Sequence, residues 1–130
     1  METIFSKIIS KKIPCHLIAE NSTAISFMDI KPIQKGHLLV VPKLQVDYLF
    51  DLDEKTYRDL WSFTKVIADG LKKTITCKRI GVSVVGFEVP HAHIHLIPIN
   101  NIKDMDFANK INMSSDELVK ISKRISDNVN

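Results

Sequence analysis

Three of the five histidines in this 130-residue chain alternate with aliphatic residues in the run His91-Ala92-His93-Ile94-His95. The residues from Val89 to Pro98 are mostly β-branched or apolar, which favours an extended strand. Because side chains alternate between the faces of a strand, the spacing predicts three imidazoles on one face, with Ala92, Ile94 and Leu96 in the core. Packing does not explain such a row, since each ring needs a hydrogen-bond partner and like charges repel.

Two chemistries can use a row of imidazoles. Neutral imidazole is the commonest protein ligand for metal ions. Alternatively, one histidine acts as a nucleophile while its neighbours handle protons and phosphate charge. A merely polar strand face is the non-functional interpretation, and a purification tag does not fit an internal run mixed with aliphatic residues. The residues alone leave metal binding and catalysis open.

The composition is that of one globular domain, residues 1–130, with 45% hydrophobic residues. No apolar run is long enough to cross a bilayer, and the N-terminus lacks the pattern of a signal peptide. Cys15 and Cys77 are far apart in the sequence and fit two reduced thiols. The net charge of +3 comes from scattered residues rather than a basic stripe. We therefore expect a cytoplasmic protein with no membrane or nucleic-acid partner.

The order of the periodic segments predicts an α+β domain with an antiparallel sheet of about five strands. One long helix should pack on this sheet, with a short helix before it and another at the C-terminus. A Ser114-Ser115-Asp116-Glu117 capping box predicts where the last helix begins. The expected helices are 3–10, 54–74 and 115–127, and the expected strands are 16–20, 23–29, 37–42, 79–86 and 89–98, followed by an irregular loop over 99–113.

The histidine run, followed by apolar residues, resembles the histidine-triad signature of the HIT superfamily. Three upstream segments, Ile4–Ile9, Phe27–Ile30 and Gly36–Lys43, fall in the order and spacing of its Hint-like branch. The resemblance covers about residues 3–98, and 99–130 is a less typical extension. It implies a HIT-like fold, a homodimer with joined sheets, and attack on the α-phosphorus of a purine nucleotide without a metal or other cofactor. Adenosine phosphoramidate, aminoacyl adenylates and dinucleoside polyphosphates are the implied substrates.

The resemblance also implies roles for individual residues. His93 would be the nucleophile that becomes nucleotidylated, His95 would contact the phosphate, His91 would order the site, and His37 would join the cluster. Asp29 would hold the ribose hydroxyls. For Ile8 and Phe27, ordinary core packing is as good an interpretation as base binding. The apolar slot around the base would be formed by Ile4, Phe5, Ile8, Phe27 and Ile30.

The chain departs from the family pattern at three places, of which Leu44-Gln45, in place of a common histidine, is the least important. Many bacterial relatives have a zinc site that begins with Cys-x-x-Cys, but the matching residues here are Thr3 and Ser6, so we expect no zinc. Phe87 and Glu88 stand where a glutamine and a small hydroxyl residue are usual. An ionised Glu88 beside a phosphate is repulsive unless it donates a proton or pairs with a basic group. The alternatives are therefore a nucleotide-binding module with weak or no catalysis, or a metal-binding protein.

Overall fold

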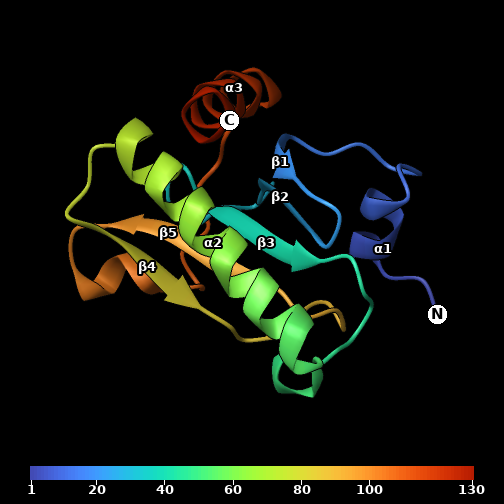
Figure 1. The fold of residues 1–130 in the computed structure, drawn as a ribbon. Helices are drawn as coiled ribbons and strands as arrows, with labels where there is room; N and C mark the ends of the chain where they lie inside the picture. The colour runs from blue at the N-terminus through green and yellow to red at the C-terminus, as the bar shows by residue number, and fades with distance from the viewer.

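The computed structural model describes residues 1–130 as an antiparallel sheet of five strands with helices on both faces (Figure 1). The strands lie in the order β1-β2-β3-β5-β4, so β1 and β4 form the two edges. This arrangement confirms the predicted α+β fold class. The elements are α1 (Ile4–Ile9), β1 (Leu17–Glu20), β2 (Ala24–Met28), β3 (Leu38–Pro42), the 3₁₀ turn η1 (Leu49–Asp51), α2 (Glu54–Thr74), β4 (Arg79–Ser83), β5 (Ile94–Ile99), the 3₁₀ turn η2 (Ile102–Met105) and α3 (Ser115–Val129).

Helix α2 has the bounds that the sequence predicts. Asp53 caps its N-terminus, where the side chain accepts a hydrogen bond from the Thr56 N–H at 3.2 Å. Lys72 and Lys73 lie in the last turn, where cations stabilise the exposed carbonyls. Its buried stripe, spaced by three or four residues, consists of Leu60, Thr64, Ile67 and Leu71. No helix of the structure is both long and apolar enough to span a membrane.

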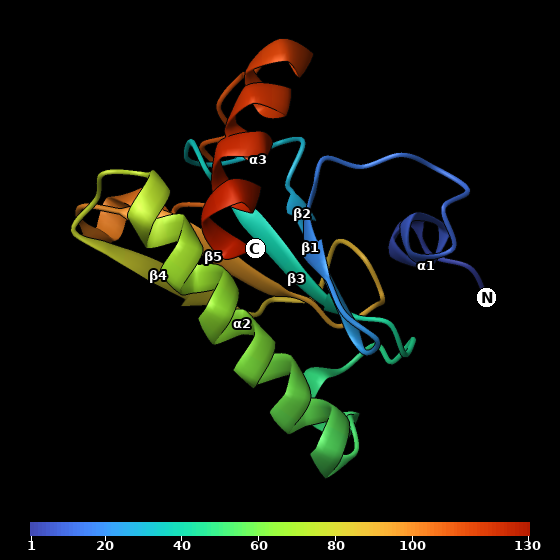
Figure 2. The ribbon, with the colours of Figure 1, turned by 45° about the horizontal axis from the view of Figure 1, so that its top comes forward.

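The alternation of side chains along the strands builds a core on each face of the sheet. Leu38 and Val40 of β3 belong to the large cluster under α2 and α3, whereas Leu39 and Val41 belong to a smaller cluster. Figure 2 shows α2 and α3 on one side of the strands and α1 apart from them. The smaller cluster consists of Phe5, Ile8, Ile25, Phe27, Leu39 and Val41. Helix α1 thus covers the second face, and the histidines lie beside it.

The predicted strand through all three histidines was wrong in its extent, because β5 begins only at Ile94. The backbone N–H of His91 donates to Val89 at 2.8 Å, and the N–H of Ala92 donates to Val46 at 2.7 Å. Neither bond belongs to a strand ladder, so the chain before β5 is a turn anchored to a neighbouring loop. The predicted core direction is confirmed, since Ala92, Ile94 and Leu96 lie in the large cluster.

The other four strands are also shorter than predicted, and β1 and β2 differ by only one residue at one or both ends. β4 ends at Ser83 rather than at residue 86, and Gly86 has a φ of +80°, which an extended strand does not allow. β3 begins at Leu38, one residue after His37, because the His37 N–H donates to the Gln34 carbonyl at 3.1 Å in a turn. His37 is therefore held by a loop as well as by its neighbouring strand.

Candidate active site

A cavity of about 680 Å³ opens on the face of the sheet beside α1. This volume lies within the range of small-molecule sites. The structure brings most of the predicted site residues to its wall, but His37 and His91 lie behind the wall. The predicted residues that line it are Ile4, Phe5, Ile8, Phe27, Asp29, Ile30, Glu88, His93 and His95.

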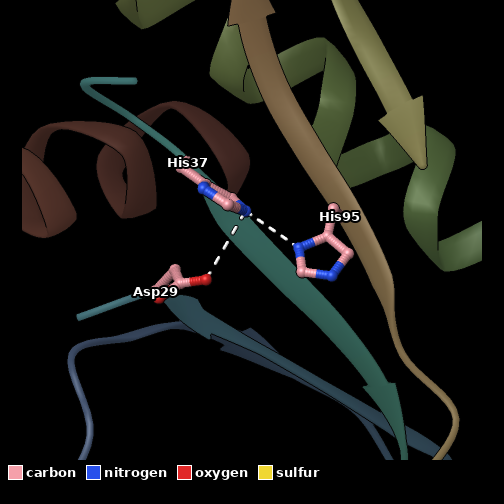
Figure 3. A group of neighbouring side chains, drawn as sticks. All are labelled: Asp29, His37 and His95. Atoms are coloured by element: carbon pink, nitrogen blue, oxygen red, sulfur yellow. Dashed lines mark hydrogen bonds and ion pairs between the residues drawn. The ribbon is translucent and has the colours of Figure 1, made fainter. Parts of the chain in front are cut away.

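Strand register brings three of the polar residues together. Met28 pairs with Leu38 across β2 and β3, and Leu39 pairs with His95 across β3 and β5. Because side chains alternate along each strand, residues 29, 37 and 95 fall on one face. Figure 3 shows His37 between the other two side chains. Residues more than 60 positions apart in the sequence, such as Asp29 and His95, therefore become neighbours.

Hydrogen bonds fix the tautomers of His37 and His95. The backbone N–H of Ile33 donates to His37 Nδ1 at 3.1 Å, so the proton of that neutral ring is on Nε2. His37 Nε2–H then donates to His95 Nδ1 at 2.9 Å (Figure 3). The remaining proton of His95 must be on Nε2. His95 lines the cavity, and it therefore offers a hydrogen-bond donor there.

Asp29 extends this chain toward the cavity. Its Oδ2 lies 3.5 Å from His37 Nε2, and its Oδ1 accepts the Lys31 N–H at 2.8 Å. Ligand atoms of Asp29, His37 and His95 all lie within 4.8 Å of one another, the spacing of a metal site. A metal on His37 Nε2 would move the ring proton to Nδ1, against the buried N–H of Ile33. The hydrogen bonds thus favour a hydrogen-bond relay, in which the Ile33 N–H fixes the ring proton of His37 and His37 fixes that of His95, over a metal centre.

His93 is held by the backbone next to it. Its Nδ1 lies 2.7 Å from the His91 carbonyl oxygen, which only accepts, so Nδ1 carries the proton. Nε2 is left as an unprotonated nitrogen on a ring that lines the cavity. The ring is 4% exposed and lies edge-on to Phe5 and His95, with both pairs of ring centroids 4.9 Å apart. His93 is therefore oriented and desolvated, as a nucleophile requires.

His91 does not reach the cavity. Its Nε2–H donates to the Pro42 carbonyl at 2.8 Å, and its Nδ1 accepts from the Thr3 hydroxyl at 3.3 Å. Thr3 and Ser6 also form the capping box of α1, with the Ser6 N–H donating to Thr3 Oγ1 at 3.0 Å. His91 therefore attaches α1 to the end of β3, and its own carbonyl orients His93. It acts on the site through other residues.

Burial keeps the histidine cluster neutral. Desolvation, with smaller contributions from Lys110 and His93, lowers the pKa of His37 to about 3. Desolvation, followed by the nearby His37 and His93, lowers the pKa of His95 to about 3 as well. The pKa of His91 is also lowered, chiefly by burial, although the Pro42 carbonyl opposes the shift. All three rings are uncharged at neutral pH.

The apolar half of the cavity lies against α1. The rings of Phe5 and Phe27 meet edge to face with centroids 5.6 Å apart. Ile8 and Phe27 are buried in the small cluster, which confirms core packing. Both also line the cavity, and their part in base binding stays a prediction. Sequence reasoning missed several other lining residues, including Ile13, Pro14, Cys15, Lys31 and Lys110. The loop sequences around them carry no periodic signal that marks them as part of a site.

Glu88 has a basic partner in the structure. Its Oε1 lies 3.9 Å from the Nζ of Lys110, and both residues line the cavity. Glu88 is thus not an isolated carboxylate beside the site, which was the concern that the sequence raised. Phe87, in contrast, is 94% exposed and does not line the cavity.

The neutral histidines predict a loss of stability in acid. The rings of His37 and His95 are neutral above pH 6.5 in the folded and the unfolded chain. Between pH 6.5 and about 3, only the unfolded chain binds protons at these two residues. The free energy of unfolding should fall as the pH falls, by about 1.4 kcal/mol per pH unit for each histidine. Urea unfolding across this range should show a flatter slope for His95→Asn, and equal slopes would contradict the assignment.

Comparisons with known proteins identify the family and support the fold. The family model described as the HIT domain matches residues 10–102. An uncharacterized HIT-like protein of Borreliella burgdorferi is 31% identical over 137 residues, 98% of this chain and 99% of that protein. An adenosine 5'-monophosphoramidase of Schizosaccharomyces pombe is 34% identical over 103 residues, 78% of this chain and 77% of that protein.

A solved structure extends the agreement to nearly the whole chain. The crystal structure of a HIT-like protein from Bartonella henselae has a TM-score of 0.86 and 30% sequence identity. The match covers 98% of this chain and 96% of that one, so it includes the segment after the histidines and α3. With the histidine motif, the sheet order and the matched family model in agreement, this chain belongs to the HIT family.

Proposed function

We propose that this protein is a nucleotide hydrolase or nucleotidyl transferase that acts on the α-phosphate of a purine nucleotide through a nucleotidyl-His93 intermediate. The observation that carries the proposal is the hydrogen bond from His93 Nδ1 to the His91 carbonyl, which leaves Nε2 unprotonated at the cavity. The relatives named adenosine 5'-monophosphoramidase in two yeasts, 34% and 33% identical, support a phosphoramidate as one substrate. Aminoacyl adenylates and dinucleoside polyphosphates are the other substrate classes that the resemblance implies.

The first step is an in-line displacement. The lone pair of His93 Nε2 forms a bond to phosphorus, and the bond from phosphorus to the leaving group breaks. The leaving atom takes the electron pair of that bond and a proton from solvent. His95 Nε2–H donates to a phosphoryl oxygen as negative charge develops there. The His91 carbonyl stabilises the charge that forms on the His93 ring.

The second step regenerates the enzyme. Water attacks phosphorus and loses a proton to solvent, while the bond from phosphorus to His93 Nε2 breaks and its electron pair returns to the ring. A transferase would use an acceptor other than water at this point. Splitting the reaction into two displacements needs only one oriented nitrogen, and the cluster supplies it without a metal ion.

The two halves of the cavity divide the nucleotide between them. The base would lie among Ile4, Ile8, Phe5 and Phe27, because a flat, largely apolar ring fits a slot lined by aliphatic and aromatic side chains. Asp29 also lines the cavity and has the two oxygens needed to accept from a pair of ribose hydroxyls. With the base and the ribose bound in this way, the phosphate would lie at His93 and His95.

Replacing the nucleophile gives the most direct test. His93→Ala should lower AMP release from adenosine 5'-phosphoramidate by at least about 10³-fold, while AMP affinity stays nearly unchanged, since the ring serves the chemistry more than binding. Intact-mass analysis of the wild type after brief mixing should trap an adenylyl adduct on His93. His16→Ala, a histidine outside the cavity, is the control. An active His93→Ala variant would refute the mechanism, and tight AMP binding without turnover by the wild type would favour the binding module.

The ribose assignment has a separate test. Asp29→Ala should weaken AMP binding by about tenfold through the loss of a charged acceptor, and should weaken 2′-deoxy-AMP binding less. Calorimetry with both nucleotides measures the difference, and Asp51→Ala, an exposed carboxylate outside the cavity, serves as the control. Equal losses for the two nucleotides would show that Asp29 does not hold the 2′-hydroxyl.

The resemblance also leads us to propose a homodimer, and the two free cysteines, Cys15 and Cys77, lead us to propose a cytoplasmic location. In support, β4 is an edge strand that carries an exposed Val82, and exposed Val84 and Val85 follow it. An unpaired edge with apolar side chains is suited to pairing with a second copy. Sedimentation equilibrium should give the mass of two chains, and Val84→Lys should shift it toward one. A monomeric wild type would disprove the dimer.

A further inference from the structure

The segment between β5 and α3 is fastened over the histidine cluster at two points. The N–H of Ile111 donates to the Pro32 carbonyl at 2.8 Å, and Gln34 Nε2 donates to the Asp104 carbonyl at 3.2 Å. Both partners belong to the β2–β3 connection, which also carries His37. Between the two points, the carboxylate of Asp106 accepts from the Ala108 N–H at 2.9 Å and closes a turn. The segment is thus held beside the site by its own hydrogen bonds.

This turn places Phe107 against the relay. The Phe107 ring meets His95 edge to face with centroids 4.9 Å apart, and meets His37 at 6.1 Å. Lys110 lies with its Nζ 5.7 Å from the centroid of the same ring. Phe107 therefore packs on the neutral histidines and positions a cation beside them.

Lys110 and Glu88 form a loose pair at the wall of the cavity. Their atoms are 3.9 Å apart, and their side chains are 35% and 78% exposed. An exposed ion pair of this kind contributes little and exchanges readily with other partners. Because His93 and His95 line the same cavity, a phosphate held there would lie within reach of the Lys110 ammonium. The Lys110–Glu88 pair can therefore separate when a substrate binds, and it contributes little to the stability of the fold.

We propose that Lys110 exchanges Glu88 for the substrate phosphate, and that the freed Glu88 carboxylate accepts a hydrogen bond from an N–H of the leaving group. This assignment rests on the proposed function and selects one substrate class for it. A phosphoramidate supplies the matching pair of groups, an anionic phosphoryl group for the ammonium and an N–H for the carboxylate. A polyphosphate instead brings a second anion toward Glu88, which repels it. The site therefore prefers amine leaving groups.

The test compares two substrates that share the adenosine 5'-phosphoryl group, adenosine 5'-phosphoramidate and diadenosine tetraphosphate. In the full chain, Lys110→Met should raise KM for both by about tenfold, through loss of the phosphate contact. Lys103→Met, an exposed lysine of the same segment outside the cavity, should leave both unchanged. Glu88→Gln removes the repulsion and should raise kcat/KM for diadenosine tetraphosphate, which lowers the preference for the phosphoramidate by about tenfold.

Two results would overturn the inference. One is a Lys110→Met variant with the same KM values as Lys103→Met, and the other is a Glu88→Gln variant with an unchanged preference. AMP binding separates this failure from that of the proposed function. A wild type without His93-dependent turnover refutes the proposed function. Even then, the Lys110 contact predicts that the AMP Kd rises about tenfold in Lys110→Met and stays constant in Lys103→Met. Equal Kd values in these two variants refute the Lys110 contact whether or not turnover occurs.

Discussion

The arrangement of the site depends on one backbone hydrogen bond, from the N–H of Ile33 to Nδ1 of His37. An amide N–H can only donate, so this bond decides where the proton of a fully buried ring must lie. Through His37 Nε2 and His95 Nδ1, 2.9 Å apart, the same choice passes to the ring that lines the cavity. The connection between β2 and β3 thereby determines that His95 presents a donor rather than a lone pair. Reversing it would bring two N–H groups face to face in a buried place, at a cost of about 1–3 kcal/mol.

The sheet provides what this relay needs. Antiparallel pairing brings the end of β2, the start of β3 and the start of β5 together, and alternation turns the three polar side chains to one face. The opposite face carries the large core under α2 and α3, which holds the strands in register. Helix α1 closes the second face and is joined to β3 through Thr3 and His91. This structural link between α1 and β3 explains why His91 belongs to the motif although it lies behind the wall of the cavity.

The sequence predicted those features that depend on local chemistry. The bounds of α2 follow from Asp53 and the apolar stripe, and α3 starts where the Ser114–Glu117 box predicts. The first residue of the histidine strand did not follow from local chemistry. The backbone N–H groups of His91 and Ala92 donate hydrogen bonds within a turn and to the loop at Val46, not to a neighbouring strand. Lys110 and Phe107 were missed for the same reason. Their positions depend on the hydrogen bonds that join Ile111 and Asp104 to the connection between β2 and β3. No residue spacing within 99–113 predicts these bonds.

A neutral cluster leaves one requirement that the motif itself does not meet. Burial lowers the pKa of His37 and His95 to about 3, so neither ring carries a positive charge at neutral pH. Their lone pairs and N–H donors are held in fixed places instead. A phosphate monoanion in the cavity then needs a cation from elsewhere, and Lys31 and Lys110 are the lysines that line it. Of these, Lys110 lies on the aromatic ring that packs against the relay. In the proposed reaction, an exposed, adaptable side chain would thus supply the charge, while the histidines would keep the fixed geometry that in-line attack requires.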